Sequence, residues 1–121
     1  MDSILNYKTQ FRSYLEEIRP DLSIQSRKLY ANQLNTIFMN TSLTEFNMMK
    51  FIMRLVNKAK RDKSLDFITL DGSNQTKNQR LSSVRSVLEA NKEAIDIKKY
   101  NNLYNLLSEV GEDLRNKITS K

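Results

Sequence analysis

The chain has 121 residues, and 20 Lys and Arg against 14 Asp and Glu give it a formal net charge of +6. It contains no His and no Cys, and only two Gly and one Pro. These absences exclude zinc fingers, disulfide scaffolds, Ser-His or Cys-His nucleophile pairs and Gly-rich phosphate loops. A β-rich domain needs more turn residues than this, so we expect an all-α protein. No cofactor is expected.

Two helices are predicted in the first third of the chain. Apolar residues recur every three or four positions over residues 3–19 and again over 23–40. Ser3 is placed to cap the first helix, and Pro20 ends it because proline disfavours helical geometry in the residue before it. The polar run at 40–42 is the expected stop of the second helix.

A third helix is predicted over residues 43–62. Ser42 and Glu45 at its start have the Ser-x-x-Glu spacing of a capping box. The apolar pattern stops between 63 and 73, where the few apolar residues do not suffice for a pair of strands. We expect an ordered loop there, held by its apolar side chains and with room for one extended stretch.

The last two predicted helices cover residues 74–91 and 100–118. Residues 92–99 between them are expected as a short helical turn or a loop. Gly111 lies inside the final apolar pattern and weakens that helix by about 1 kcal/mol relative to Ala. The chain is therefore expected to form one compact bundle of four to five helices.

The positive charge is concentrated in three segments, with net charges of +2 over 23–41, +5 over 50–63 and +3 over 73–85. In the second segment, cations at i, i+4, i+8 and i+11 share an arc of about 80° on the predicted helix. These cations are Lys50, Arg54, Lys58 and Arg61. Ordinary solvated faces mix charge signs, because like charges four residues apart repel. The arc therefore favours a polyanionic partner, and a simple solvated face is the alternative.

Two predicted helix starts have side chains suited to nucleic acid. A helix start offers free N–H groups and a positive dipole end to phosphate, and Asn, Gln, Lys and Arg also bind base edges. The residues are Gln25, Ser26, Arg27 and Lys28 in one start, and Gln75, Thr76, Lys77, Asn78 and Arg80 in the other. The alternative for each is a capped, solvated start. Together with the basic arc they favour nucleic acid as the partner.

These segments resemble the core-binding (SAM-like) domain of tyrosine recombinases and phage integrases. Ser26, Tyr30 and Leu34 match a Ser/Thr-x-x-x-Tyr-x-x-x-Leu pattern of that domain. The stretch 42–46 is similar to the opening of its next helix. The stretch 74–88 is similar to its Arg-Leu-Ser-x-Leu/Val-Arg helix, which is the most specific of the three motifs.

The resemblance covers about residues 20–110 and implies an orthogonal SAM-like bundle that forms one half of a clamp on duplex DNA. It assigns DNA contacts to both helix starts, while Arg85 follows the pattern and could equally stabilise the bundle. The family acts in DNA integration and site-specific recombination, but its catalytic Tyr, Arg, Lys and His lie in a separate domain. We therefore expect binding without catalysis, either by the N-terminal piece of a longer recombinase or by a stand-alone relative.

The alternative from another class is a helical protein–protein module whose basic face meets an acidic partner. A catalytic domain or neighbouring protomers are further partners that the resemblance implies. No small-molecule substrate is expected. The sequence shows no secretory signal and no apolar run long enough for a bilayer, so we expect an intracellular protein, cytoplasmic or nuclear, without a membrane partner.

Overall fold

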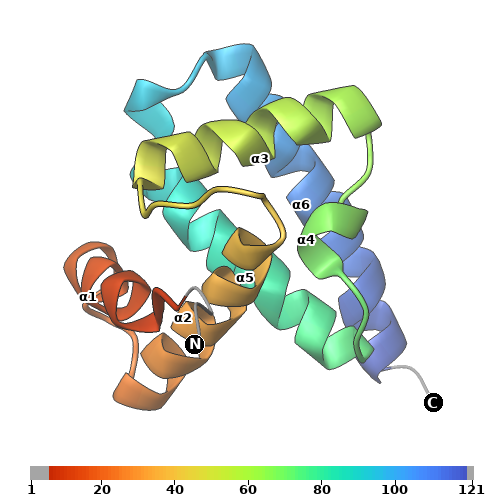
Figure 1. The fold of residues 1–121 in the computed structure, drawn as a ribbon. Coiled ribbons are helices and arrows are strands. Elements are labelled where there is room, and N and C mark those ends of the chain that lie inside the picture. Colours follow the sequence, from red (N-terminus) through yellow and green to blue (C-terminus); the bar gives the residue numbers. More distant parts are fainter. Residues whose placement is uncertain (1–5, 120–121) are drawn as a thin grey trace.

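The computed structural model describes residues 6–119, which form six α-helices and one 3-10 turn, with no strand among them (Figure 1). The elements are α1 (Lys8–Ile18), α2 (Ile24–Met39), α3 (Met48–Asp62), α4 (Asp66–Thr69), α5 (Asn74–Ala90), η1 (Lys92–Ala94) and α6 (Ile97–Thr119). The predicted all-α bundle is confirmed, with a one-turn helix added to the five longer ones. Within residues 6–119, no helix has both the length and the apolar character needed to cross a membrane.

Helix α5 is the centre of the arrangement. It packs against α6, α2, α4 and α1, while α3 lies across the upper part of the view in Figure 1 and packs on α6. The four apolar residues that periodicity assigns to the inner face of α5 are all buried: Leu81, Val84, Val87 and Leu88. Because each helix buries one apolar stripe in a shared core, a few apolar residues per helix are enough to form that core.

An aromatic cluster joins the first half of the chain. The rings of Phe11, Phe38 and Phe51 come from α1, α2 and α3 and are fully buried. Their centroids lie 5.4 to 6.0 Å apart, a spacing at which tilted and edge-to-face aromatic pairs are favourable. Helix α1 is further fixed on α2 by the backbone N–H of Tyr7, which donates to Oδ1 of buried Asn35 at 2.8 Å.

The starts of α2 and α5 follow the local sequence. The hydroxyl oxygen of Ser23 accepts a hydrogen bond from the backbone N–H of Ser26, and that of Ser73 accepts one from Thr76, each at 3.1 Å. Both serines are therefore N-caps, so both starts are capped, which the sequence left open as the alternative for them. Helix α1 ends before Pro20 as predicted, but it begins only at Lys8, since Asn6 and Tyr7 are not helical. The predicted cap at Ser3 lies outside the described residues.

The capping box predicted at Ser42 is wrong. Ser42 has a φ of 70°, in the left-handed region, whereas an N-cap needs extended geometry. Helix α3 begins five residues later than predicted, behind Asn47, whose side chain accepts from the N–H of Lys50 at 3.0 Å. The intervening chain instead carries Phe46 to the ring of Phe11, 5.0 Å away between centroids. Contact with the core replaces one more turn of helix there.

The two connections in the second half also differ in part from the prediction. Residues 63–73 are held by apolar side chains as expected, through buried Leu65 and Ile68, but they form the one-turn helix α4 and no extended stretch. The 3-10 turn η1 agrees with the short helical turn allowed at 92–99. Helix α6 begins at Ile97, three residues early, because Asp96 Oδ2 accepts from the first free N–H groups at 3.2 Å.

Candidate nucleic-acid interface

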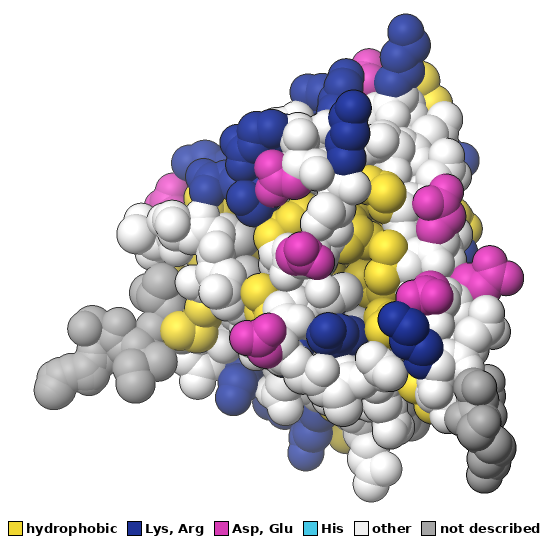
Figure 2. Space-filling view, turned by 90° about the vertical axis from the view of Figure 1, so that its right-hand side faces the viewer, with side chains coloured by type: hydrophobic (Ala, Val, Ile, Leu, Met, Phe, Trp, Pro, Cys, Tyr) yellow, Lys and Arg dark blue, Asp and Glu magenta, His cyan; other side chains and the backbone are white. Residues whose placement is uncertain are grey.

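The four cations predicted to share an arc do line one outward face of α3. We call Lys50, Arg54, Lys58 and Arg61 the α3 basic surface. Together with the chain at 40–43 they border two hollows of about 370 and 300 Å³, which share three of the four cations. Figure 2 shows Lys and Arg side chains gathered along the upper left edge of the molecule, at the height of α3 in Figure 1.

Two of these cations are held in place by the fold. The Arg54 guanidinium donates to the backbone carbonyl of Thr41, which ties α3 to the chain that follows α2. The Lys58 ammonium lies 5.6 Å from the ring centroid of Phe67, a cation–π distance. The surface is therefore partly preorganised, which lowers the entropy cost of binding an anion.

Two carboxylates also lie at this surface: Asp62 follows Lys58 at i,i+4 on the same helix, whereas Glu45 comes from the chain before α3, outside the helical spacing. Glu45 lies 3.4 Å from the ammonium of Lys50, and Asp62 lies 3.3 Å from Lys58 and 3.2 Å from Arg61. Hydrogen bonds from Arg61 above all, and from Lys58, lower the pKa of Asp62, so this carboxylate is ionised at neutral pH. Two carboxylates therefore offset about half of the positive charge of the surface.

At the start of α2 the predicted residues divide into outward and inward side chains. Gln25 and Lys28 are exposed, and Ser26 is half-buried. Arg27 is only 12% exposed; its Nη2 donates to the carbonyl of Leu22 at 3.0 Å, and its Nη1 lies 3.7 Å from Glu16 on α1. Arg27 thus links the first two helices instead of facing solvent.

Arg80, in the second turn of α5, is also turned into the bundle. Its Nε donates to Oε1 of Gln33 on α2 at 2.9 Å. Its Nη1 donates to the carbonyls of Thr69 at 2.5 Å and Asp71 at 3.1 Å. One guanidinium therefore joins α5 to α2 and to the end of α4.

The other predicted residues of α5 are Gln75, which is exposed, and Thr76, Lys77 and Asn78, which are half-buried. Arg85 packs against α6, with its guanidinium 4.9 Å from the ring centroid of Tyr104 and its Nη2 donating to that hydroxyl at 2.8 Å. The bundle-stabilising contact that the sequence left open for Arg85 is thus present.

The three predicted segments do not form one continuous surface. In Figure 1 the first turns of α2 and α5 lie along the lower edge of the view, well apart, and α3 crosses the upper part. A straight duplex that contacts α3 would therefore not reach all the predicted residues at once.

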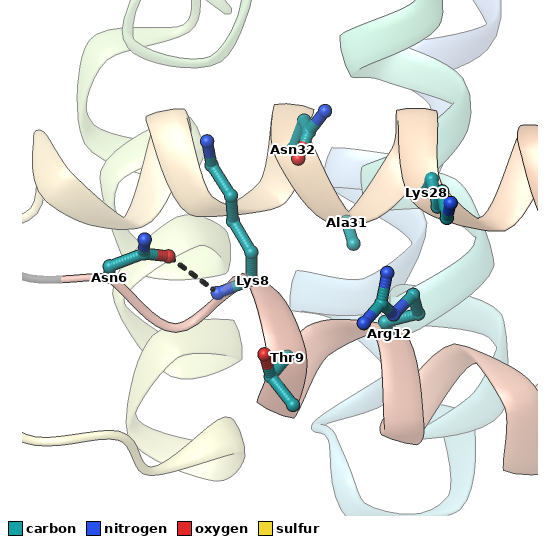
Figure 3. Close-up of a pocket in the computed structure, with 7 residues that line it drawn as sticks. All are labelled: Asn6, Lys8, Thr9, Arg12, Lys28, Ala31 and Asn32. Atoms are coloured by element: carbon teal, nitrogen blue, oxygen red, sulfur yellow. Dashed lines mark hydrogen bonds between the residues drawn. The ribbon is translucent and has the colours of Figure 1, made fainter.

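Lys8 and Arg12 are exposed cations that the sequence reasoning missed. They lie four residues apart on α1 and border a groove with Lys28 of α2 (Figure 3). The charges of residues 1–19 sum to zero, which hid this pair. The signal that would have found it is the spacing itself, because residues four apart share a helix face.

Comparison with known proteins adds no relative. A scan against models of protein families, a search of curated proteins and a search of solved structures each found no match to this chain. The resemblance to recombinase core-binding domains therefore stands on the sequence motifs alone. Within the described residues, no group of three or more His, Cys, Asp or Glu side chains is arranged to hold a metal ion.

Proposed function

We propose that this chain is a non-catalytic duplex-DNA-binding bundle that contacts the phosphate backbone through the α3 basic surface. The observation that carries the proposal is the row of four cations on one outward face, bordering two adjoining hollows. Contacts of Lys and Arg with phosphates release counterions and supply affinity that does not depend on base sequence. The surface offers no comparable set of base-reading amides, so recognition of shape and charge is expected to dominate.

The motif resemblance supports a place for this bundle as the binding half of a recombinase or integrase-like protein. Two of the three motifs fall on helices here, around Tyr30 in α2 and Leu81 in α5. The stretch 42–46, which should open a helix in such a domain, is not helical in this chain. The first and third motifs therefore carry the resemblance.

An acidic protein partner is the second candidate, and one observation favours it. Half-buried Leu43, Met53 and Phe67 line the same hollows as the cations. Apolar side chains beside cations suit a peptide that combines carboxylates with hydrophobic residues, whereas a phosphate backbone makes no use of them. The two candidates differ most in their salt dependence and in which ligand binds at all.

The test is a fluorescence anisotropy titration of labelled duplex DNA with the full chain at several salt concentrations. If each of the four α3 cations neutralises one phosphate, log K falls with log[salt] with a slope of about −3.6. The absence of binding even at low salt contradicts the proposal. Binding of an acidic, apolar peptide under the same conditions would then support the protein partner.

The double variant Lys50→Gln with Arg61→Gln tests whether the α3 basic surface is the interface. Its stability should change little, because the two side chains are 61% and 70% exposed. Because two phosphate contacts are lost, the slope of log K against log[salt] should become less steep by about 1.8. The matched control is Lys60→Gln with Lys63→Gln, which removes the same charge from exposed positions outside both hollows. An equal effect in the control would mean that net charge, and not this surface, governs binding.

A further inference from the structure

The groove between α1 and α2 is a second concentration of positive charge, separate from the α3 basic surface. It has a volume of about 430 Å³ and is lined by Asn6, Lys8, Thr9, Arg12, Lys28, Ala31 and Asn32 (Figure 3). Three of the seven lining residues are cations, and three of the other four carry an amide or hydroxyl group. No residue that lines the groove is acidic.

The cations of this groove have no ionic partner in the part of the chain that the structure describes. No carboxylate between residues 6 and 119 lies within ion-pair distance of Lys8, Arg12 or Lys28. Glu16 lines the adjoining hollow together with Arg12 and Lys28, but its ion pair is with Arg27, at 3.7 Å. This contrasts with α3, where the fold supplies carboxylates to three of four cations.

Helix geometry explains why the cations meet. Lys8 and Arg12 share one face of α1, and Lys28 and Asn32 share one face of α2, each pair being four residues apart. Ala31 is 1% exposed and lies between the helices, where its small side chain leaves room above it. Like charges at this spacing repel each other, so the arrangement costs stability unless an anion binds.

The close-up shows how the side chains are disposed. Lys8 extends from α1 up across α2, its ammonium to the left of Asn32, and the Arg12 guanidinium lies between the two helices, facing Ala31 (Figure 3). Lys28 stands on α2 on the far side of Arg12 from Lys8. The cationic groups are thus spread along the groove, which suits an elongated anion better than a single point charge.

The lining also limits the chemistry of the ligand. It contains no aromatic ring on which a base could stack, and Ala31 is its single apolar residue. Arg12 offers a planar fork of donors, and the two lysines offer compact charges, both of which suit phosphate oxygens. We propose that the α1–α2 groove binds a run of phosphate groups, supplied either by the backbone of a nucleic acid or by a free polyphosphate.

The test uses the full 15N-labelled chain and two probes in separate titrations, inorganic tripolyphosphate and duplex DNA. The backbone amide signals of Lys8, Thr9 and Asn32 are expected to shift with at least one probe. In Lys8→Gln with Arg12→Gln, affinity for the probe that binds should fall on the order of tenfold. Lys60→Gln with Lys63→Gln removes the same charge elsewhere and should leave the shifts unchanged.

The outcomes separate the sources of phosphate. Shifts with tripolyphosphate alone support a free polyphosphate ligand, and shifts with DNA alone support the nucleic-acid backbone. Shifts with neither probe, or equal weakening in the control variant, overturn the proposal. Lys28→Gln, which changes the other helix at an exposed position, repeats the test if the double variant unfolds. The proposal does not rest on DNA binding, since a chain that binds tripolyphosphate but no duplex refutes only the proposed function.

Discussion

Helices α3 and α5 both carry a marked excess of positive charge, but they use it in opposite ways. On α3, the cations stand on an outward face and border two hollows. On α5, Arg80 and Arg85 donate to groups on α2, α4 and α6, which leaves Lys77 as the cation of that helix without a polar partner among the described residues.

The difference follows from what each side chain has within reach. A guanidinium has five donors in a fixed plane and can satisfy several carbonyls at once, so an arginine beside a helix end readily links elements. Helix α5 is central and its arginines reach acceptors on neighbouring elements, whereas on α3 Arg54 donates to the carbonyl of Thr41 and the other three cations pair with carboxylates at the surface. Charge counted along a sequence therefore overestimates the charge available to a ligand when it falls on a central helix.

The largest expected effect tests whether Arg80 stabilises the bundle. Arg80→Ala removes three hydrogen bonds and leaves the half-buried Gln33 and the buried Thr69 short of a donor, so it should lower the free energy of unfolding by about 2–3 kcal/mol. Urea unfolding followed by circular dichroism measures this. Lys77→Ala, one turn earlier on the same helix, should change it by about 0.5 kcal/mol or less. An Arg80 variant that keeps full stability but loses DNA affinity would show that Arg80 contacts DNA and does not stabilise the bundle, which would contradict the difference drawn between α3 and α5.

The parts of the fold that the sequence predicts are those decided locally. The starts of α2 and α5 depend on Ser23 and Ser73 and on an N–H three residues away, so they could be predicted. The start of α3 could not, because it depends on Phe46 reaching the ring of Phe11, 35 positions earlier in the chain. A contact at that separation leaves no periodic trace in the sequence.

The same distinction applies to the candidate site. The α3 arc could be predicted, because helical spacing alone places its residues on one face. The inward direction of the Arg27 and Arg80 side chains could not be predicted, because their partners include Glu16 on α1 and Gln33 on α2. Nor could the carboxylate of Glu45 at Lys50 be anticipated, because it lies beyond the true start of α3.

A smaller effect is expected at the start of α3 itself. Asn47→Ala removes the side-chain acceptor of the Lys50 N–H and should cost about 1 kcal/mol of stability. Glu45→Ala, which would be the costly change if the Ser-x-x-Glu capping box existed, should cost about 0.5 kcal/mol or less because Glu45 is exposed. Thermal or urea unfolding compares the two. A larger loss from Glu45 than from Asn47 would contradict the observed helix start.

The carboxylate of Asp62 gives a test of the α3 basic surface in the other direction. Asp62→Asn removes a charge beside Lys58 and Arg61, so duplex DNA affinity at pH 7 should rise about threefold. The lowered pKa of Asp62 means that its ion pairs persist at neutral pH and are lost only as pH falls through that lowered value. The same titration on Glu112→Gln, an exposed acid of α6, should show no gain. Equal gains in both variants would mean that the α3 surface is not the contact.

The smallest effect concerns the packing of α5 against α6 at Gly111. A Cβ added there would lie 3.2 Å from Nη1 of Arg115 and 3.9 Å from Oδ1 of Asn78. The first of these atoms is the end of a flexible, exposed side chain that can move by a few tenths of an ångström. Alanine gains about 1 kcal/mol of helix propensity over glycine. Part of this gain is offset by the displaced guanidinium, so Gly111→Ala should stabilise the chain by about 0.5 kcal/mol in urea unfolding. Destabilisation would instead show that Arg115 and Asn78 cannot move to accommodate the added methyl group. Asn78, a predicted DNA-contact residue, would then stabilise the packing of α5 on α6, as Arg80 stabilises its packing on α2.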